Sequence, residues 1–132
     1  MINLLVIDDD ESYIQLLSSS LNKTEFILQT ASTGAKGLDI AKKEKTDFIL
    51  LDEILPDLPG NEILRLFKSD PELKKIPISI LSDYSDLGMK QAALNNGAIE
   101  YLLKYELDMK ILGSKIKQLL NSSSINTQNP TG

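Results

Sequence analysis

Five short apolar runs alternate along the chain with stretches of helical periodicity, and this alternation constrains the fold more than any other feature. The apolar runs predict β-strands at residues 3–7, 26–31, 48–51, 77–81 and 99–103. Between and after them, apolar residues recur every three or four positions and predict helices at 12–22, 33–45, 61–70, 86–96 and 107–120. Strands separated by helices form parallel sheets covered on both faces, so we expect an α/β fold.

The helix boundaries and the last segment of the chain are predicted from single residues and from composition. Asn61 is expected to cap the third helix at its start, and Ile111 is expected to face inward from the fifth. Beyond Leu120, the segment NSSSINTQNPTG has almost no apolar residue and no periodicity. We therefore expect one domain at residues 1–120, followed at 121–132 by a disordered tail or the start of a linker.

The composition limits the kinds of site that this chain can build. Cysteine and histidine are both absent, which excludes disulfides, thiolate and imidazole metal ligands, and a histidine base or nucleophile. Any metal would therefore be bound by oxygen atoms, the ligands of Mg²⁺ and similar hard cations. A net charge of −5 argues against a nucleic-acid surface. The lack of a signal peptide or a long apolar run predicts a cytoplasmic protein without a membrane anchor.

Polar side chains follow four of the five predicted strands, at the point where each strand ends. Because the carboxyl ends of parallel strands lie at one edge of a sheet, these side chains are expected to meet there. Carboxylates about 4 Å apart repel each other by roughly 4 kcal/mol at an effective dielectric constant of about 20, and a divalent cation would offset that repulsion. In chain order, the residues are Asp8, Asp9 and Asp10 after the first strand, Asp52 after the third, Ser82 after the fourth and Lys104 after the fifth.

Structural and chemical explanations compete for these residues. A lone aspartate at a strand end commonly caps a turn, and the acidic run at 8–10 could cap the following helix. Capping does not explain why Ser82 and Lys104 reach the same edge. The combination favours phosphoryl transfer to a carboxylate, in which Asp52 is the nucleophile and the acidic residues hold Mg²⁺. Lys104 would supply a fixed positive charge, and Ser82 a hydrogen-bond donor to the phosphoryl group.

Because of these residues and their spacing, the segment 1–120 resembles the receiver domain of bacterial two-component response regulators. Each of four separated motifs is weak alone, but their order and spacing are specific. They are the acidic pair after the first strand, the D-x-x-[LM]-P-x-x-x-G element from Asp52 to Gly60, Ser82 after the fourth strand and Lys104 after the fifth. The resemblance implies a flavodoxin-like, doubly wound sheet of five parallel strands in the order 2-1-3-4-5, with five helices.

The resemblance also implies a role for Asp52 and for a cation. Asp52 would accept a phosphoryl group from a phosphohistidine of a histidine kinase or a histidine phosphotransfer protein. Asp9 would bind Mg²⁺, or another hard divalent cation such as Mn²⁺, directly, and Asp8 would bind it through water. Asp52 and the backbone carbonyl of Ile54 would complete the metal ligands. Such a domain is a signalling switch and not an enzyme, since it catalyses only its own phosphorylation and dephosphorylation.

Ser82 and Tyr101 match the family's switch pair, in which the hydroxyl moves toward the phosphoryl group and the aromatic ring turns inward. Ordinary packing in a strand explains Tyr101 equally well. The pair flanks a surface made of the predicted elements 86–96, 99–103 and 107–120. We expect this surface to change on phosphorylation and to contact an effector or a second copy of the chain. No output domain follows it, so the chain is either a stand-alone receiver or a piece of a longer regulator.

Three features depart from the family pattern. Asp83 stands where the family has a small residue, and its charge would oppose an incoming anion. Tyr105 stands where a proline usually follows the lysine, so we expect a trans peptide and a differently shaped loop. Asp10 makes the acidic pair ambiguous, and Asp8 with Asp9 is preferred because Asp8 directly follows the apolar run.

Two alternative functions stay open. Asp83 and Tyr105 motivate a pseudo-receiver, which binds partners without being phosphorylated. The segment Asp8–Ser12 (DDDES) resembles the D-x-D-x-[TV] nucleophile motif of haloacid-dehalogenase-like phosphatases, which also use a later serine or threonine and a lysine. The chain has no room for the cap domain of those enzymes, and the loop after Asp52 has no role in them. The phosphatase is therefore the weaker alternative.

Overall fold

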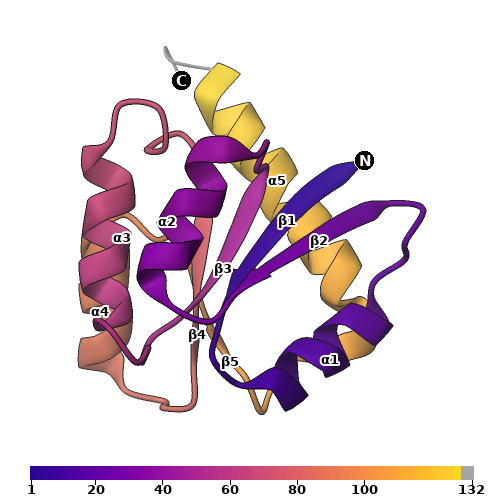
Figure 1. The fold of residues 1–132 in the computed structure, drawn as a ribbon, viewed down its shortest axis with the longest axis horizontal. Coiled ribbons are helices and arrows are strands. Elements are labelled where there is room, and N and C mark those ends of the chain that lie inside the picture. The colour runs from indigo at the N-terminus through magenta and orange to yellow at the C-terminus, as the bar shows by residue number, and fades with distance from the viewer. Residues whose placement is uncertain (129–132) are drawn as a thin grey trace.

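The computed structural model describes the chain from residue 1 to 128, and its side chains from 1 to 122. Five parallel strands form a sheet in the order β2-β1-β3-β4-β5 (Figure 1). The predicted parallel sheet and its strand order are confirmed. The strands are β1 (Ile2–Ile7), β2 (Phe26–Ala31), β3 (Phe48–Asp52), β4 (Ile78–Ser82) and β5 (Glu100–Leu103).

Helices cover both faces of the sheet (Figure 1). Side chains of α2, α3 and α4 pack with the sheet in one core cluster, and those of α1 and α5 form a second cluster on the other face. Within the described residues, no helix is long and apolar enough to cross a bilayer. The helices are α1 (Glu11–Ser20), α2 (Gly34–Lys43), α3 (Gly60–Ser69), α4 (Leu87–Asn95) and α5 (Leu112–Gln128), with a 3₁₀ turn, η1 (Met109–Ile111), before α5.

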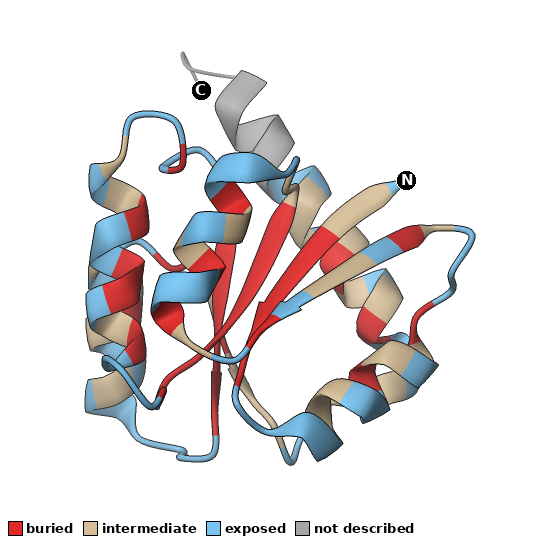
Figure 2. Cartoon of the chain, in the orientation of Figure 1, coloured by how far each residue is buried: buried red, intermediate tan, exposed pale blue. Residues whose placement is uncertain are grey.

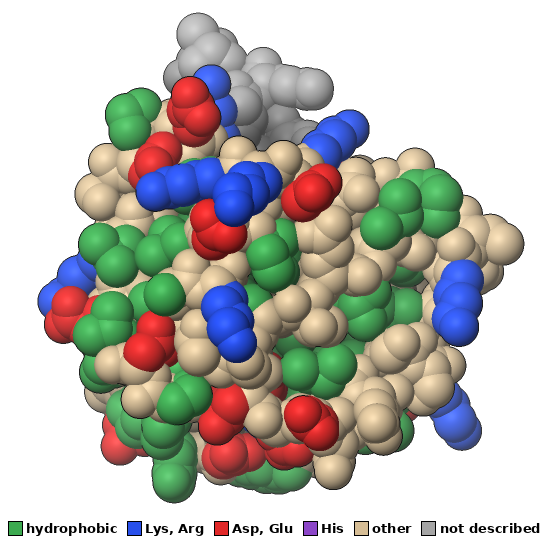
Figure 3. Space-filling view, viewed as in Figure 1, with side chains coloured by type: hydrophobic (Ala, Val, Ile, Leu, Met, Phe, Trp, Pro, Cys, Tyr) green, Lys and Arg blue, Asp and Glu red, His purple; other side chains and the backbone are tan. Residues whose placement is uncertain are grey.

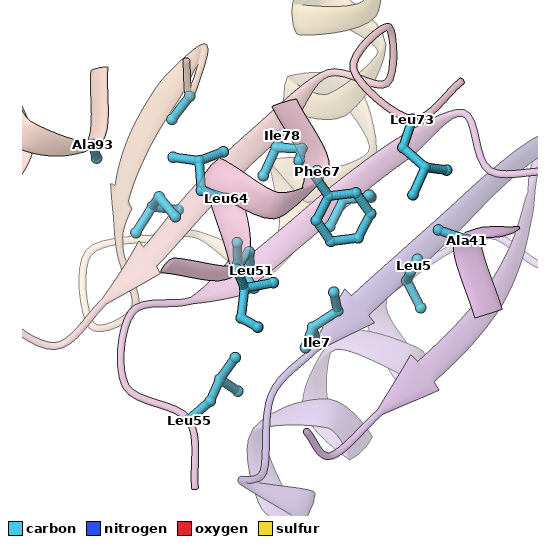
Figure 4. Close-up of a cluster of buried hydrophobic side chains, with 14 of the residues drawn as sticks. Leu5, Ile7, Ala41, Leu51, Leu55, Leu64, Phe67, Leu73, Ile78 and Ala93 are labelled. Carbon is cyan, nitrogen blue, oxygen red and sulfur yellow. The ribbon is translucent and has the colours of Figure 1, made fainter. Parts of the chain in front are cut away.

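The central strands are buried along their whole length. Every residue of β3 and β4 is buried, and Figure 2 shows them in red behind helices whose outer faces are exposed. Phe67 and Leu64 of α3 belong to the same buried cluster as Ile7 and Leu51 of the sheet, and Figure 4 shows these side chains between helix and sheet. Burying one such side chain stabilises the fold by about 1.5–3 kcal/mol. The polar residues at the strand ends therefore extend from a well-packed core.

The chain between β3 and α3 folds back tightly on the end of β3. The Gly60 N–H donates to the Glu53 carbonyl oxygen at 2.7 Å, and Ile54 pairs with Pro59 across the turn. A Cβ atom on Gly60 would lie 2.4 Å from the Asp52 carbonyl oxygen, so a side chain does not fit there without moving the backbone.

Three predictions about helices differ from the structure. The prediction that Asn61 caps α3 is wrong, because the helix already begins at Gly60 and has no side-chain cap. Ile111 is 53% exposed, since it lies in η1 and not on the inward face of α5. The last helix continues to Gln128, because no glycine or proline interrupts the polar segment before that residue. Residues 129–132 lie outside the described residues, so a tail or linker there stays a prediction.

Asp57 fastens the β3–α3 loop to a second helix. Its two carboxylate oxygens accept hydrogen bonds from the backbone N–H groups of Gly34 and Ala35, at 2.9 and 3.0 Å. These N–H groups belong to the first turn of α2, where no helical carbonyl oxygen is available to them. The hydrogen bond from Gly34 lowers the pKa of Asp57, and the bond from Ala35 adds to this effect. The loop is thus held to β3 on one side and to α2 on the other.

Replacing Asp57 with alanine is expected to destabilise the protein by about 1 kcal/mol near neutral pH, because two helix N–H groups lose their acceptor. A carboxyl group whose pKa falls on folding stabilises the protein above its unfolded pKa, and this contribution is lost as the pH falls through the folded pKa. The difference between wild type and Asp57→Ala should therefore shrink in acid. Urea unfolding from about pH 7 down to about pH 3 measures it.

Asp57→Asn is the matched control for this measurement. Its side chain keeps one acceptor oxygen and loses the charge, so its loss of stability should be smaller and nearly independent of pH. A loss for Asp57→Ala that stays constant down to about pH 3 would contradict the assignment.

Candidate functional site

Three carboxylates meet at the carboxyl edge of the sheet. Asp8 follows β1 and is fully buried, Asp9 is exposed beside it, and Asp52 ends β3. Each offers one carboxylate oxygen, and these oxygens all lie within 4.8 Å of one another. In Figure 3, acidic side chains gather along the lower edge, where Figure 1 shows β1, β3 and β4 ending. Carboxylate oxygens are the donors that Mg²⁺ and Mn²⁺ prefer, so these residues fit a hard divalent cation.

Asp10, the third aspartate of the run, has a different environment. Its carboxylate accepts a hydrogen bond from the Tyr13 N–H at 3.1 Å and caps α1. Its own backbone N–H donates to Asp8 Oδ1 at 2.9 Å, which fixes the orientation of the Asp8 carboxylate. Asp8 and Asp9 therefore form the acidic cluster with Asp52, and Asp10 caps α1.

Lys104 brings a positive charge to the cluster from the end of β5. Its Nζ atom lies 2.7 Å from Asp8 Oδ2 and 3.6 Å from Asp52 Oδ2, and only 8% of its side chain is exposed. The backbone N–H of Lys104 donates to the Ser82 carbonyl oxygen at 2.9 Å, which extends the β4–β5 pairing to this residue. The described chain contains no cis peptide, so the bond between Lys104 and Tyr105 is trans, as expected.

Burial and crowding change the proton affinity of these groups. Burial raises the pKa of Asp52 to about 7, the negative charge of Asp8 adds to the rise, and Lys104 opposes it. Burial alone would lower the pKa of Lys104, but its hydrogen bond to Asp8 and the charge of Asp52 raise that pKa above its ordinary value. Without a cation, Asp52 therefore binds a proton near neutral pH while Lys104 stays charged.

The cluster opens into a shallow pocket of about 250 Å³, enough for a small anion beside a cation. Its walls include Asp9, Asp52 and Lys104, together with Ile54 from the β3–α3 loop and Asp83 after β4. The Ile54 N–H lies 3.5 Å from Asp52 Oδ1. Asp83 is exposed, and its negative charge acts on any anion that enters the pocket.

Ser82 and Tyr101 form a buried pair behind the pocket. Ser82 has no exposed surface, and Tyr101 is 7% exposed. The Tyr101 hydroxyl donates to Ser82 Oγ, 2.8 Å away, and lies 2.9 Å from the Tyr84 carbonyl oxygen. The Ser82 hydroxyl in turn lies 3.0 Å from Glu53 Oε1. The aromatic ring is therefore inward in this structure, and the Ser82 hydroxyl is bound by Glu53.

Two residues of the site are not identified by the sequence patterns. Tyr13 reads as part of the apolar stripe of α1, yet its ring centre lies 4.8 Å from Lys104 Nζ, a cation–π contact. Burial and the charge of Asp8 raise the pKa of Tyr13 to about 12. Glu53 reads as a variable position of the loop motif. Both residues lie close in sequence to strand-end aspartates, and that position is the signal that points to them.

A sequence model of the response regulator receiver domain matches residues 4–121 of the chain. The response regulator PleD of Caulobacter vibrioides is 30% identical over 116 residues, which are 88% of this chain and 25% of PleD. The alkaline phosphatase synthesis transcriptional regulatory protein PhoP of Bacillus subtilis is 32% identical over 122 residues, 92% of this chain and 50% of PhoP. The chain thus spans between a quarter and half of the length of these two relatives.

The fold is shared with solved structures as well. A CheY-like response regulator receiver domain protein from Methanospirillum hungatei matches with a TM-score of 0.84 and 25% identity. The match covers 96% of this chain and 98% of that one.

Asp52→Asn is expected to stabilise the metal-free protein at about pH 8 by about 2–4 kcal/mol, because the variant carries no buried charge at this position. The folded wild type binds a proton at Asp52 more tightly than the unfolded chain, so wild-type stability falls as the pH rises toward the folded pKa of about 7. The gain should therefore shrink toward about pH 4. Urea unfolding in the presence of EDTA measures it, and a gain independent of pH would contradict the raised pKa.

Proposed function

Because the chain belongs to the family of response regulator receiver domains, we propose that it is a phosphoacceptor switch of a two-component system. In this proposal, Asp52 receives a phosphoryl group from a phosphohistidine of a histidine kinase or a histidine phosphotransfer protein. The observation that carries it is the cluster of Asp52 with Asp8 and Asp9, beside a pocket that Asp52 lines together with Asp9 and Lys104. Packing alone gives no reason to gather three carboxylates, because their mutual repulsion costs stability.

The proposed reaction is a displacement at phosphorus. A carboxylate oxygen of Asp52 forms a bond to phosphorus while the bond from phosphorus to the imidazole nitrogen of the donor breaks, and the imidazole leaves with that electron pair. The product is an acyl phosphate on Asp52. This chain contains no histidine, so the donor lies outside it.

Lys104 and the acidic residues have separate tasks in this proposal. Lys104 Nζ, 3.6 Å from Asp52 and 2.7 Å from Asp8, is positioned to bind a phosphoryl oxygen while Asp8 holds it in place. Asp9, Asp8, Asp52 and the backbone carbonyl of Ile54 are the proposed ligands of Mg²⁺ or another hard divalent cation such as Mn²⁺. When bound, the cation neutralises charge on the carboxylates and on the phosphoryl oxygens.

The face formed by α4, β5 and α5 is the proposed output surface. Tyr101 connects the buried Ser82 to a groove of about 540 Å³ between these elements. Leu87 and Ile111 line this groove and are 79% and 53% exposed, so they offer apolar area that a partner can cover. We assign the face to an effector or to a second copy of the chain.

Asp83 supports a second candidate, a pseudo-receiver that binds partners without phosphorylation. Its exposed carboxylate lines the pocket and repels the anion that a phosphoacceptor must admit. The phosphatase alternative has less support, because Asp10, the second aspartate of its motif, caps α1.

An NMR titration with beryllofluoride, a mimic of the phosphoryl group, tests the proposal. In the wild type, amide signals should shift from Asp52 to Ser82 and Tyr101 and across α4, β5 and α5, and they should do so only with Mg²⁺ present. In Asp52→Asn these shifts should vanish, because the carboxylate that binds the mimic is gone.

Other outcomes would identify the alternatives. No shifts in either protein, with well-dispersed spectra, would overturn the phosphoacceptor and favour the pseudo-receiver. Turnover of a small phosphate ester that Asp10→Asn abolishes and Asp52→Asn leaves intact would favour the phosphatase.

A further inference from the structure

Glu53, the residue after Asp52, is a buried carboxylate that the proposed reaction does not use. Only 7% of its surface is exposed. Its backbone N–H donates to the Leu81 carbonyl oxygen at 2.9 Å, and its carbonyl oxygen accepts from the Gly60 N–H at 2.7 Å. The backbone of Glu53 is thus fixed between β4 and the start of α3, and this fixes the direction in which its side chain leaves the turn.

The hydroxyl of Ser82 has one proton to donate, and its neighbours decide where that proton points. Ser82 Oγ accepts hydrogen bonds from the Tyr101 hydroxyl at 2.8 Å and from the Tyr84 N–H at 2.9 Å. With the Tyr101 hydroxyl as a donor to Oγ, two acceptors remain within reach of the Ser82 proton, Glu53 Oε1 at 3.0 Å and the Tyr84 carbonyl oxygen at 3.2 Å. The carboxylate is the closer acceptor and forms the stronger, charge-assisted bond. The Ser82 proton therefore points to Glu53.

Glu53 depends on Ser82 in turn. Its second oxygen, Oε2, is buried and has no hydrogen-bond partner among the described residues, whereas Oε1 receives the Ser82 hydroxyl. Losing that hydroxyl would remove the hydrogen bond at Oε1 as well, and a buried carboxylate without donors is strongly disfavoured. Each group therefore holds the other in place.

We propose that Glu53 is a positioning residue that holds the Ser82 hydroxyl in the arrangement of the unphosphorylated site. Before Ser82 can donate a hydrogen bond to a phosphoryl group on Asp52, its hydroxyl proton must turn away from Glu53. Glu53 thereby sets how strongly the switch resists phosphorylation. The inference rests on the proposed function of Asp52. It identifies Glu53 as the residue that opposes the response of Ser82 to phosphorylation.

The affinity for beryllofluoride with Mg²⁺, compared in four proteins, tests this role. They are the wild type, Glu53→Ala, Ser82→Ala and the double variant. Glu53→Ala should bind the mimic about tenfold more tightly, because the ligand no longer competes with a carboxylate for the Ser82 proton. When Ser82→Ala is already present, adding Glu53→Ala should leave the affinity unchanged. An equal gain with and without Ser82→Ala would overturn the proposal and identify Glu53 as a source of charge repulsion only.

Two further variants serve as controls. Glu53→Gln keeps the volume of the side chain and remains an acceptor without the charge, so it should fold as the wild type does and give a smaller gain than Glu53→Ala. Asp83→Ala also removes a carboxylate that lines the pocket. Its effect on affinity should be the same with and without Ser82→Ala, because it acts through charge alone.

A measurement without ligand separates this inference from the proposed function. NMR couplings of the Ser82 β-protons should report one χ1 rotamer in the wild type and a changed rotamer population in Glu53→Ala. Unchanged couplings would overturn the role of Glu53 even where beryllofluoride binds normally. Failure of the wild type to bind beryllofluoride would overturn the proposed function instead, and the couplings would still decide whether Glu53 holds Ser82.

Discussion

The repulsion between the carboxylates of Asp8 and Asp52 is the constraint on which the site depends. The two residues follow or end neighbouring parallel strands, β1 and β3, so the sheet itself brings them together. Lys104 offsets the repulsion from the end of β5, with its Nζ 2.7 Å from Asp8 and 3.6 Å from Asp52. Because β4 lies between β3 and β5, the charge balance exists only when most of the sheet has formed. The charge balance of the site therefore requires β1, β3 and β5 to be in place together.

Much of the fold and of the site could be predicted because it depends on pattern and not on side-chain detail. Apolar runs such as Phe48–Leu51 alternate with amphipathic helices, and a covered parallel sheet satisfies both. The carboxyl ends of parallel strands share an edge, so the sequence predicted Asp52 and Lys104 at the same edge of the sheet, and in the structure Lys104 Nζ lies 3.6 Å from Asp52 Oδ2. The strand order came from the family resemblance, and the structure confirms it.

What could not be predicted depends on the backbone path through loops. Whether Glu53 faces water or Ser82 is set by the turn that Ile54 and Pro59 close, and no periodicity encodes that turn. The predicted start of α3 was wrong for the same reason. Asn61 is a good capping residue, but α3 already begins at Gly60, whose backbone lies against the end of β3.

The close approach of Gly60 to the end of β3 has a consequence for natural variation in this chain. Gly60 has no reactive group, yet any side chain there would press on the carbonyl oxygen of Asp52 and the backbone of Glu53. In natural variants, a substitution at this uncharged position would therefore shift the backbone of Asp52, the proposed phosphoacceptor.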